Sequence, residues 1–341
     1  MTSFDPDAPA RPGALFGLPH TPADAALVVV PVPFEATASY GRGTSGAPDA
    51  VLAASAQVDL TDLETGEPWR AGMAMEAIDP QLLDWNDEAS ALALDVIEAG
   101  GAVDAESTEK AARVNAIGAR LNSWVYARTR ALLDAGKIPA ILGGDHSVPF
   151  GAIQAAAETY PGLGVLHIDA HADLRAAYEG FTWSHASIFH NVKTRLPAVG
   201  PLVQVGIRDV GAAELAFARE RDDVWMFTDP ELAWELAGDE PWLRICARIV
   251  RPLPRDVWVS FDIDGLEPSL CPGTGTPVPG GLRWRDALLL LRVLSENGHR
   301  IVGFDLCEVG AGEWDANVGA RLLYKLAGWA IQSRNNPGPR A

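Results

Sequence analysis

The sequence predicts an α/β fold: a single three-layer α-β-α domain built on a doubly wound, mostly parallel sheet. Short apolar runs alternate with helical segments from Ala26 to about residue 330, which is typical of parallel strands joined by crossover helices. The runs are apolar at successive positions, as in strands buried on both faces. Because no linker rich in Pro, Gly or Ser divides them, we predict one domain over residues 26–332, an arm over 1–25 and a tail over 333–341.

The expected elements follow one another along the chain. Residues 1–25 are rich in Pro, Gly and Asp without an apolar period, which predicts an extended arm. The first strand is expected to begin at Ala26. The sequence from Ala89 to Gly136 is typical of helix, with a break at a Gly-Gly pair. A short helix is expected near 149–159. The later strands are predicted in six runs: IPAILG, GVLHID, LVQVGI, VWMF, VWVSFDID and IVGFDLCEV.

Composition and charge exclude several classes of protein. The chain has 45 acidic and 27 basic residues and a formal charge of −18, which disfavours nucleic acids and anionic membranes as partners. The amino terminus lacks the pattern of a signal peptide, and no run of about 18 apolar residues follows. Three cysteines without a CxxC pair argue against a disulfide framework. We therefore expect a cytoplasmic protein.

The first two candidate groups follow predicted strands, at the sheet edge where open α/β sheets place their ligands. In GGDHS, two glycines permit a sharp turn that delivers His146, although a single histidine there is more often packed than a ligand. In DAHAD, the residues Asp169, His171 and Asp173 recur at every second position, so extended backbone points all three to one side. His167 shares that period, but we expect a hydrogen-bonded core histidine.

A third group closes the run VWVSFDID. Asp262 and Asp264 end an otherwise apolar strand, and burying two neighbouring carboxylates is costly unless a cation compensates them. The three groups together supply two imidazoles and four carboxylates, too many for one zinc ion and suited to two divalent ions. The pattern favours a two-metal hydrolase. Motifs for nucleotide binding or a serine nucleophile, such as GxGxxG after a strand or GxSxG, are missing.

These three motifs, GGDHS at 143–147, DAHAD at 169–173 and SFDIDG at 260–265, resemble those of the ureohydrolases, the family of arginases, agmatinases and their relatives. Weaker similarity extends from about residue 26 to 330. Within the family, the sequence most resembles an agmatinase-related branch that includes guanidine hydrolases. The resemblance implies an arginase-like fold, hydrolysis of the C–N bond of linear amidines or guanidines, and a homo-oligomer, either a hexamer or a trimer.

The resemblance also implies a binuclear centre of Mn²⁺ or Ni²⁺ that activates water to attack the guanidinium carbon, so that urea is released. Asp169 and Asp262 would bridge the two ions. One ion would be held by His146, Asp169, Asp173 and Asp262, and the other by His171, Asp169, Asp262 and Asp264.

Two further residues match catalytic positions of the family. Glu308 would hold the planar guanidinium, for which a carboxylate is the geometric complement. His185 would carry protons to the leaving amine. The sequence also departs from the family: Glu267 replaces the aspartate of an Asp-Pro pair, and Ala186 stands where familiar arginases and agmatinases have glycine. The segment with which arginases capture an amino-acid head group is not recognisable, which disfavours arginine.

The substrate expected from these features is a small cationic guanidino compound. No Lys or Arg occurs over 176–192, which counts against carboxylate tails such as guanidinobutyrate or formiminoglutamate. Tyr178, Phe181, Trp183 and Trp314 would either wall a small pocket or pack at a subunit interface, and we name Trp183 as a candidate substrate contact. We therefore expect guanidine or a small alkylguanidine, with agmatine, guanidinobutyrate and formiminoglutamate as alternatives.

Two predictions from other classes stay open. The chain would be a single-zinc deacetylase on an arginase-like fold if it bound about one ion. It would be an inactive partner subunit of a hetero-oligomer if activity required a second gene product.

Overall fold

The computed structural model describes residues 4–335. Eight strands in this part of the chain form one sheet in the order β2-β1-β3-β8-β7-β4-β5-β6, and every neighbouring pair is parallel. This confirms the predicted fold class. The strands are β1 Leu27–Val32, β2 Met73–Met75, β3 Ile138–Gly143, β4 Leu163–Ile168, β5 Val199–Ile207, β6 Val224–Thr228, β7 Asp256–Asp262 and β8 Arg300–Cys307.

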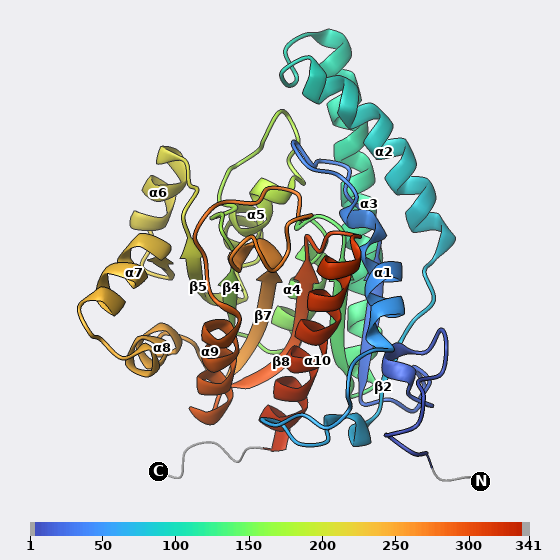
Figure 1. Ribbon diagram of the computed structural model, residues 1–341. Coiled ribbons are helices and arrows are strands. Elements are labelled where there is room, and N and C mark those ends of the chain that lie inside the picture. The colour runs from blue at the N-terminus through green and yellow to red at the C-terminus, as the bar shows by residue number, and fades with distance from the viewer. Residues whose placement is uncertain (1–3, 336–341) are drawn as a thin grey trace.

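Helices cover both faces of the sheet (Figure 1). They are α1 Ala47–Ser55, α2 Pro80–Glu98, α3 Ala105–Asp134, α4 Phe150–Thr159, α5 Ile188–Arg195, α6 Ala212–Arg219, α7 Asp229–Ala237, α8 Trp242–Val250, α9 Trp284–Glu296 and α10 Glu313–Asn335. Helices α1, α8, α9 and α10 pack on one face and α2 to α5 on the other. In β1, Leu27 and Val29 enter the first core while Val28 and Val30 enter the second, as the two-residue period of a strand requires.

The four central strands position the candidate site. In the chain, β4 follows β3 directly, but in the sheet β8 and β7 lie between them, so the strand order reverses there. Such a switch point opens a crevice outside the carboxyl ends of the strands. The register pairs His167 of β4 with Ser260 of β7, and Ser260 with Asp305 of β8. The polar residues of these strands therefore lie side by side.

The predicted Gly-Gly break separates two helices, because Gly100 and Gly101 have positive φ and the Asp104–Ser107 capping box starts α3 anew. Two features differ from the prediction. The first of these helices, α2, begins at Pro80 and not near Ala89. The edge strand β2 was missed, because three residues are too short for a recognisable apolar period.

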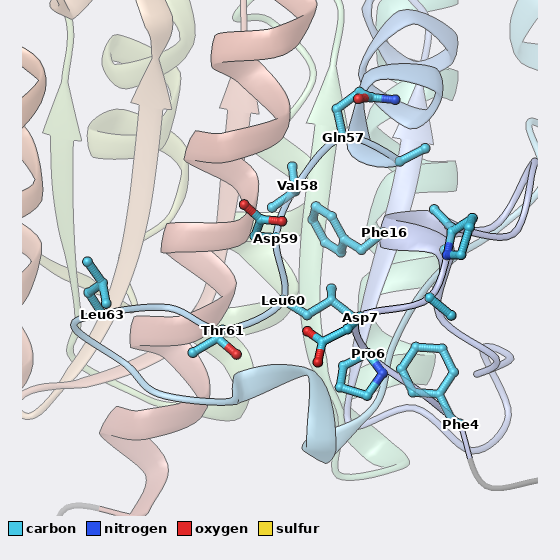
Figure 2. Close-up of a pocket in the computed structure, with 15 residues that line it drawn as sticks. Phe4, Pro6, Asp7, Phe16, Gln57, Val58, Asp59, Leu60, Thr61 and Leu63 are labelled. Atoms are coloured by element: carbon cyan, nitrogen blue, oxygen red, sulfur yellow. The ribbon is translucent and has the colours of Figure 1, made fainter.

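The described part of the amino-terminal arm packs on the domain. The Phe16 ring lies 4.8 Å from that of Tyr324, and its backbone N–H donates to Ser55 Oγ. A cavity of about 860 Å³ lies between residues 4–17 and 56–63 (Figure 2), and no candidate site residue lines it. Of the predicted tail, residues 333–335 belong to α10, and 336–341 lie outside the described residues. No helix over 4–335 is long and apolar enough to span a membrane.

Candidate metal centre and substrate site

The turn after β3 places His146 beneath the crevice. A Cβ on Gly144 would lie 2.2 Å from the carbonyl oxygen of Phe34, so only glycine allows the chain to pass here. The turn continues into Asp145, whose carboxylate accepts hydrogen bonds from the backbone N–H and the hydroxyl of Ser147. His146 is consequently held at 1% exposure and faces the ends of β4 and β7.

The six predicted metal ligands meet in one place, and we name them the donor cluster: His146, Asp169, His171, Asp173, Asp262 and Asp264. Three carboxylate oxygens surround His146 Nδ1, at 3.0 Å from Asp169, 3.3 Å from Asp262 and 3.4 Å from Asp173. His171 Nδ1 lies 3.0 Å from Asp264 and 3.4 Å from the second oxygen of Asp169. Asp169 therefore belongs to two groups of donors.

The local backbone explains how closely spaced residues converge. The extended path predicted over residues 169–173 does not hold, because β4 ends at Ile168, the chain bends at Ala170 and Asp173 has a φ of +53°, which is unusual for a residue other than glycine. Asp262 ends β7 and caps the following 3₁₀ turn by accepting from the backbone N–H of Asp264. The strain at Asp173 is a feature that clusters at functional sites.

The electrostatics of the donor cluster call for a cation. Burial and the neighbouring Asp169 raise the pKa of Asp173 to about 7, and burial with Asp264 and Asp169 raises the pKa of Asp262. Although burial opposes the shift, Asp169 and Asp264 raise the pKa of His171 to about 12. Four acids and two imidazoles at this spacing suit one or more divalent cations that accept N and O ligands. The residues present thus fit a metal centre.

A second layer of polar residues supports these donors, and sequence reasoning missed most of it. His167 is buried as predicted, and its Nε2 lies 2.7 Å from Asp169 while its Nδ1 lies 3.0 Å from the amide nitrogen of Gln204. Below His146, Ser260 and Asp305 form a further chain of contacts. Only the strand register, which the sequence alone does not provide, brings these residues together.

Glu308 lies at the end of β8 beside the donor cluster. Its Oε1 accepts from the backbone N–H of His146 at 3.1 Å, and its Oε2 is buried without a hydrogen-bond partner. Burial, Asp145 and Asp264 raise the pKa of this carboxyl. Its φ of +60° is again in the left-handed region. A Cβ on Gly275 would lie 2.7 Å from Oε2, so the Pro/Gly-rich loop covers this group closely.

His185 reaches the same crevice from the loop before α5. Its Nδ1 lies 3.2 Å from Thr37 Oγ1, which is also 3.2 Å from Asp145 Oδ2. The Tyr178 ring packs edge-on against it, with centroids 6.2 Å apart. Burial lowers the pKa of His185, and Asp145 partly opposes that shift. A neutral imidazole in this position can exchange a proton near neutral pH.

A cavity of about 150 Å³ opens beside these groups, and of them only His171, Asp173 and His185 line it. It is lined by Ser39, His171, Asp173, Arg175, Tyr178, His185, Ala186, Asp209, Glu214 and Thr276. We call Arg175, Tyr178, Asp209 and Glu214 the rim. The Arg175 guanidinium lies over the Tyr178 ring at 4.9 Å and its Nε is 3.5 Å from Glu214. The charge of Arg175 is thus already compensated.

Two expectations about the substrate pocket need correction. Trp183 does not line this cavity, because its ring packs against Phe150 at 4.9 Å and its Cβ rests on Gly118 of α3. It borders a separate depression on the outer side of α3 and α4. The absence of Lys and Arg over 176–192 is also a weaker argument against substrates with a carboxylate tail than expected. Arg175, one residue before that range, lies at the rim.

Comparisons with known proteins agree with this geometry. A model described as the arginase family matches residues 25–328. The N(1)-aminopropylagmatine ureohydrolase of Thermus thermophilus is 34% identical over 333 residues, covering 92% of this chain and 94% of that protein. Its counterpart in Synechocystis sp. is 31% identical over 319 residues, covering 92% and 91%. The crystal structure of agmatine ureohydrolase from Thermoplasma volcanium shares the fold, with a TM-score of 0.71 at 24% identity over 95% of this chain and 96% of that one.

Proposed function

This chain belongs to the arginase family and is a ureohydrolase, and from this premise we propose that it hydrolyses a small guanidino compound to urea at a two-metal site. The observation that carries the proposal is the donor cluster, in which Asp169 presents one oxygen to the group around His146 and the other to the group around His171. A shared carboxylate between two donor groups suits two ions better than the single zinc of a deacetylase.

Each ion would have its own set of donors. His146 and Asp173 would serve one, His171 and Asp264 the other, and Asp169 and Asp262 would serve both. Mn²⁺ and Ni²⁺ both accept imidazole and carboxylate ligands, so we propose either as the working metal. When bound, two divalent cations lower the pKa of water and supply a nucleophile near neutral pH.

Glu308 would bind the guanidinium of the substrate. Its Oε2 is buried without a hydrogen-bond partner, and a buried carboxylate with a raised pKa is stabilised when a cation pairs with it. A planar guanidinium can donate two parallel hydrogen bonds to such a group. The fixed position of Glu308 would orient the guanidinium carbon toward the donor cluster.

His185 would transfer a proton to the leaving nitrogen. It lines the cavity together with His171, and its contact with Thr37 fixes the ring from the opposite side. Burial lowers its pKa, which favours the neutral imidazole that can accept a proton and pass it to the leaving nitrogen.

The size of the cavity favours a compact substrate. About 150 Å³ corresponds to roughly five water molecules at about 30 Å³ each, which accommodates guanidine or a short alkylguanidine. A second candidate is agmatine, whose ammonium tail would reach the rim. The exposed Asp209, which forms no ion pair among residues 4–335, favours such a tail, and Glu214 compensates Arg175, the rim cation that would attract a carboxylate.

The proposal is tested by loading the purified protein with Mn²⁺ or Ni²⁺ and measuring urea release from guanidine, methylguanidine, agmatine, guanidinobutyrate and arginine. We expect guanidine or methylguanidine to give the highest kcat/KM, with agmatine second. Urea from none of them would overturn the proposal, and activity that appears only with a second gene product would identify a partner subunit. We also propose a cytoplasmic homo-oligomer, trimer or hexamer, which sedimentation of the purified protein measures.

A further inference from the structure

A buried chain of hydrogen bonds runs from the donor cluster into the sheet. His146 Nε2, on the ring edge away from the carboxylates, lies 2.9 Å from Ser260 Oγ. Ser260 Oγ lies 2.8 Å from Asp305 Oδ1, and Trp258 Nε1 donates to Asp305 Oδ2 at 2.6 Å. His146 is 1% exposed and the other three are fully buried. The parallel pairing of β7 with β8 sets Ser260 beside Asp305.

The chemistry of these groups fixes the direction of the chain. An indole N–H can only donate, so Asp305 must accept from Trp258. The single hydroxyl proton of Ser260 is then donated to the other oxygen of Asp305, and Ser260 Oγ is left to accept from His146 Nε2–H. This assigns the Nε2–H tautomer to a neutral His146 and leaves the lone pair on Nδ1, which faces the carboxylates of the donor cluster.

Asp305 has few other partners. Among residues 4–335 no lysine or arginine pairs with it, and the nearest imidazole is that of His146, with Nε2 at 3.5 Å. Cys307 Sγ adds a weak contact at 3.8 Å. Burying a carboxylate that only neutral donors contact costs free energy, unless the carboxylate interacts with a positive charge nearby. The nearest place where the proposed function puts positive charge is the Nδ1 edge of His146, which faces the donor cluster.

We propose that Asp305, acting through Ser260, is a positioning residue that fixes the ring orientation and tautomer of His146 for metal binding through Nδ1. This inference rests on the proposed two-metal function. Asp305 itself would contact neither metal nor substrate. Carboxylates that orient a ligating histidine through its second nitrogen strengthen metal binding about 10–100-fold.

The test measures Mn²⁺ binding to the metal-free full-length protein by calorimetry and counts the ions retained after dialysis. In Ser260→Ala and in Asp305→Asn, we expect one site to weaken by about 10–100-fold while the other keeps its affinity. Ser333→Ala is the matched control, because Ser333 is equally buried and bonds backbone groups on β8 and α10 far from the donor cluster. Its two affinities should match the wild type.

A double variant identifies the affected site. His171→Ala alone should retain one ion, and His171→Ala with Ser260→Ala should retain none, because the two changes act on different donor groups. Two unchanged affinities in both Ser260→Ala and Asp305→Asn, with native circular dichroism, would overturn the inference and leave the proposed function standing. A folded wild-type protein that binds no Mn²⁺ or Ni²⁺ would overturn both. If Ser260→Ala does not fold, Asp305→Asn, which keeps the side-chain volume, decides.

Discussion

The donor cluster and the rim meet at one cavity, which His171 and Asp173 of the cluster line, but they are built by different means. The donor cluster comes from the ends of β3, β4 and β7, and its aspartates are at most 4% exposed. The rim comes from loops except for Glu214, which lies in α6, and Arg175 and Asp209 are exposed to solvent. Side chains at the ends of paired strands are held in fixed positions, as the activation of a water molecule requires. Loop residues can be replaced without disturbing the sheet. We therefore expect that changes at the rim alter the choice of substrate without altering the type of reaction, which depends on the donor cluster.

The strongest test of that separation removes the shared donor. Asp169→Asn replaces the carboxylate that serves both donor groups, so we expect both ions to be lost on dialysis. Turnover of every guanidino substrate should fall at least about 10³-fold, because bound metals supply several kcal/mol to such reactions. Metal analysis and urea release measure the two effects. A variant that keeps two ions and full activity would refute the assignment.

His185 belongs to a loop but faces the donor cluster, so its replacement tests where the two regions divide. His185→Ala should lower kcat by about 10²–10⁴-fold, because the variant lacks the proton donor. Its metal content should not change, because His185 is not a metal ligand. Stopped urea assays with metal analysis on the same sample measure this. Loss of metal in place of loss of turnover would make His185 a ligand.

Glu308→Gln should keep both ions and lower kcat/KM by about 10²–10³-fold, because the buried partner of the guanidinium loses its charge. The effect should be similar for guanidine and agmatine, which share that group. Glu313→Gln, at the exposed start of α10, is the matched control and should be silent. Equal activity in the two variants would remove Glu308 from the substrate site.

The smallest effect is expected at the rim. Asp209→Asn should raise KM for agmatine about 2–5-fold, the amount that a solvent-exposed ion pair contributes, and should leave guanidine kinetics unchanged. The exposed Asp222 offers the control substitution, Asp222→Asn. An equal loss for both substrates would show that Asp209 acts on the donor cluster and not on the tail.

The sequence predicted the donor cluster because each donor lies within a few residues of a strand end, and parallel strands bring such ends to one edge. It did not predict the chain from His146 to Asp305, since the link between Ser260 and Asp305 exists only in the register of two strands distant in sequence. Trp183 was misplaced for a related reason. Its environment is set by Gly118 and Phe150, whose packing against the loop no local pattern reveals.

The order of strands has a consequence for how the protein is made. His146 and Asp169 are synthesised within one short stretch, yet β8 and β7 must enter the sheet between β3 and β4 before the two side chains acquire their native surroundings. A nascent chain that has emerged only as far as α6 therefore exposes the unpaired edges of β3 and β4. The donor cluster is therefore complete only after β7 and β8 have joined the sheet, which makes its assembly a late step of folding.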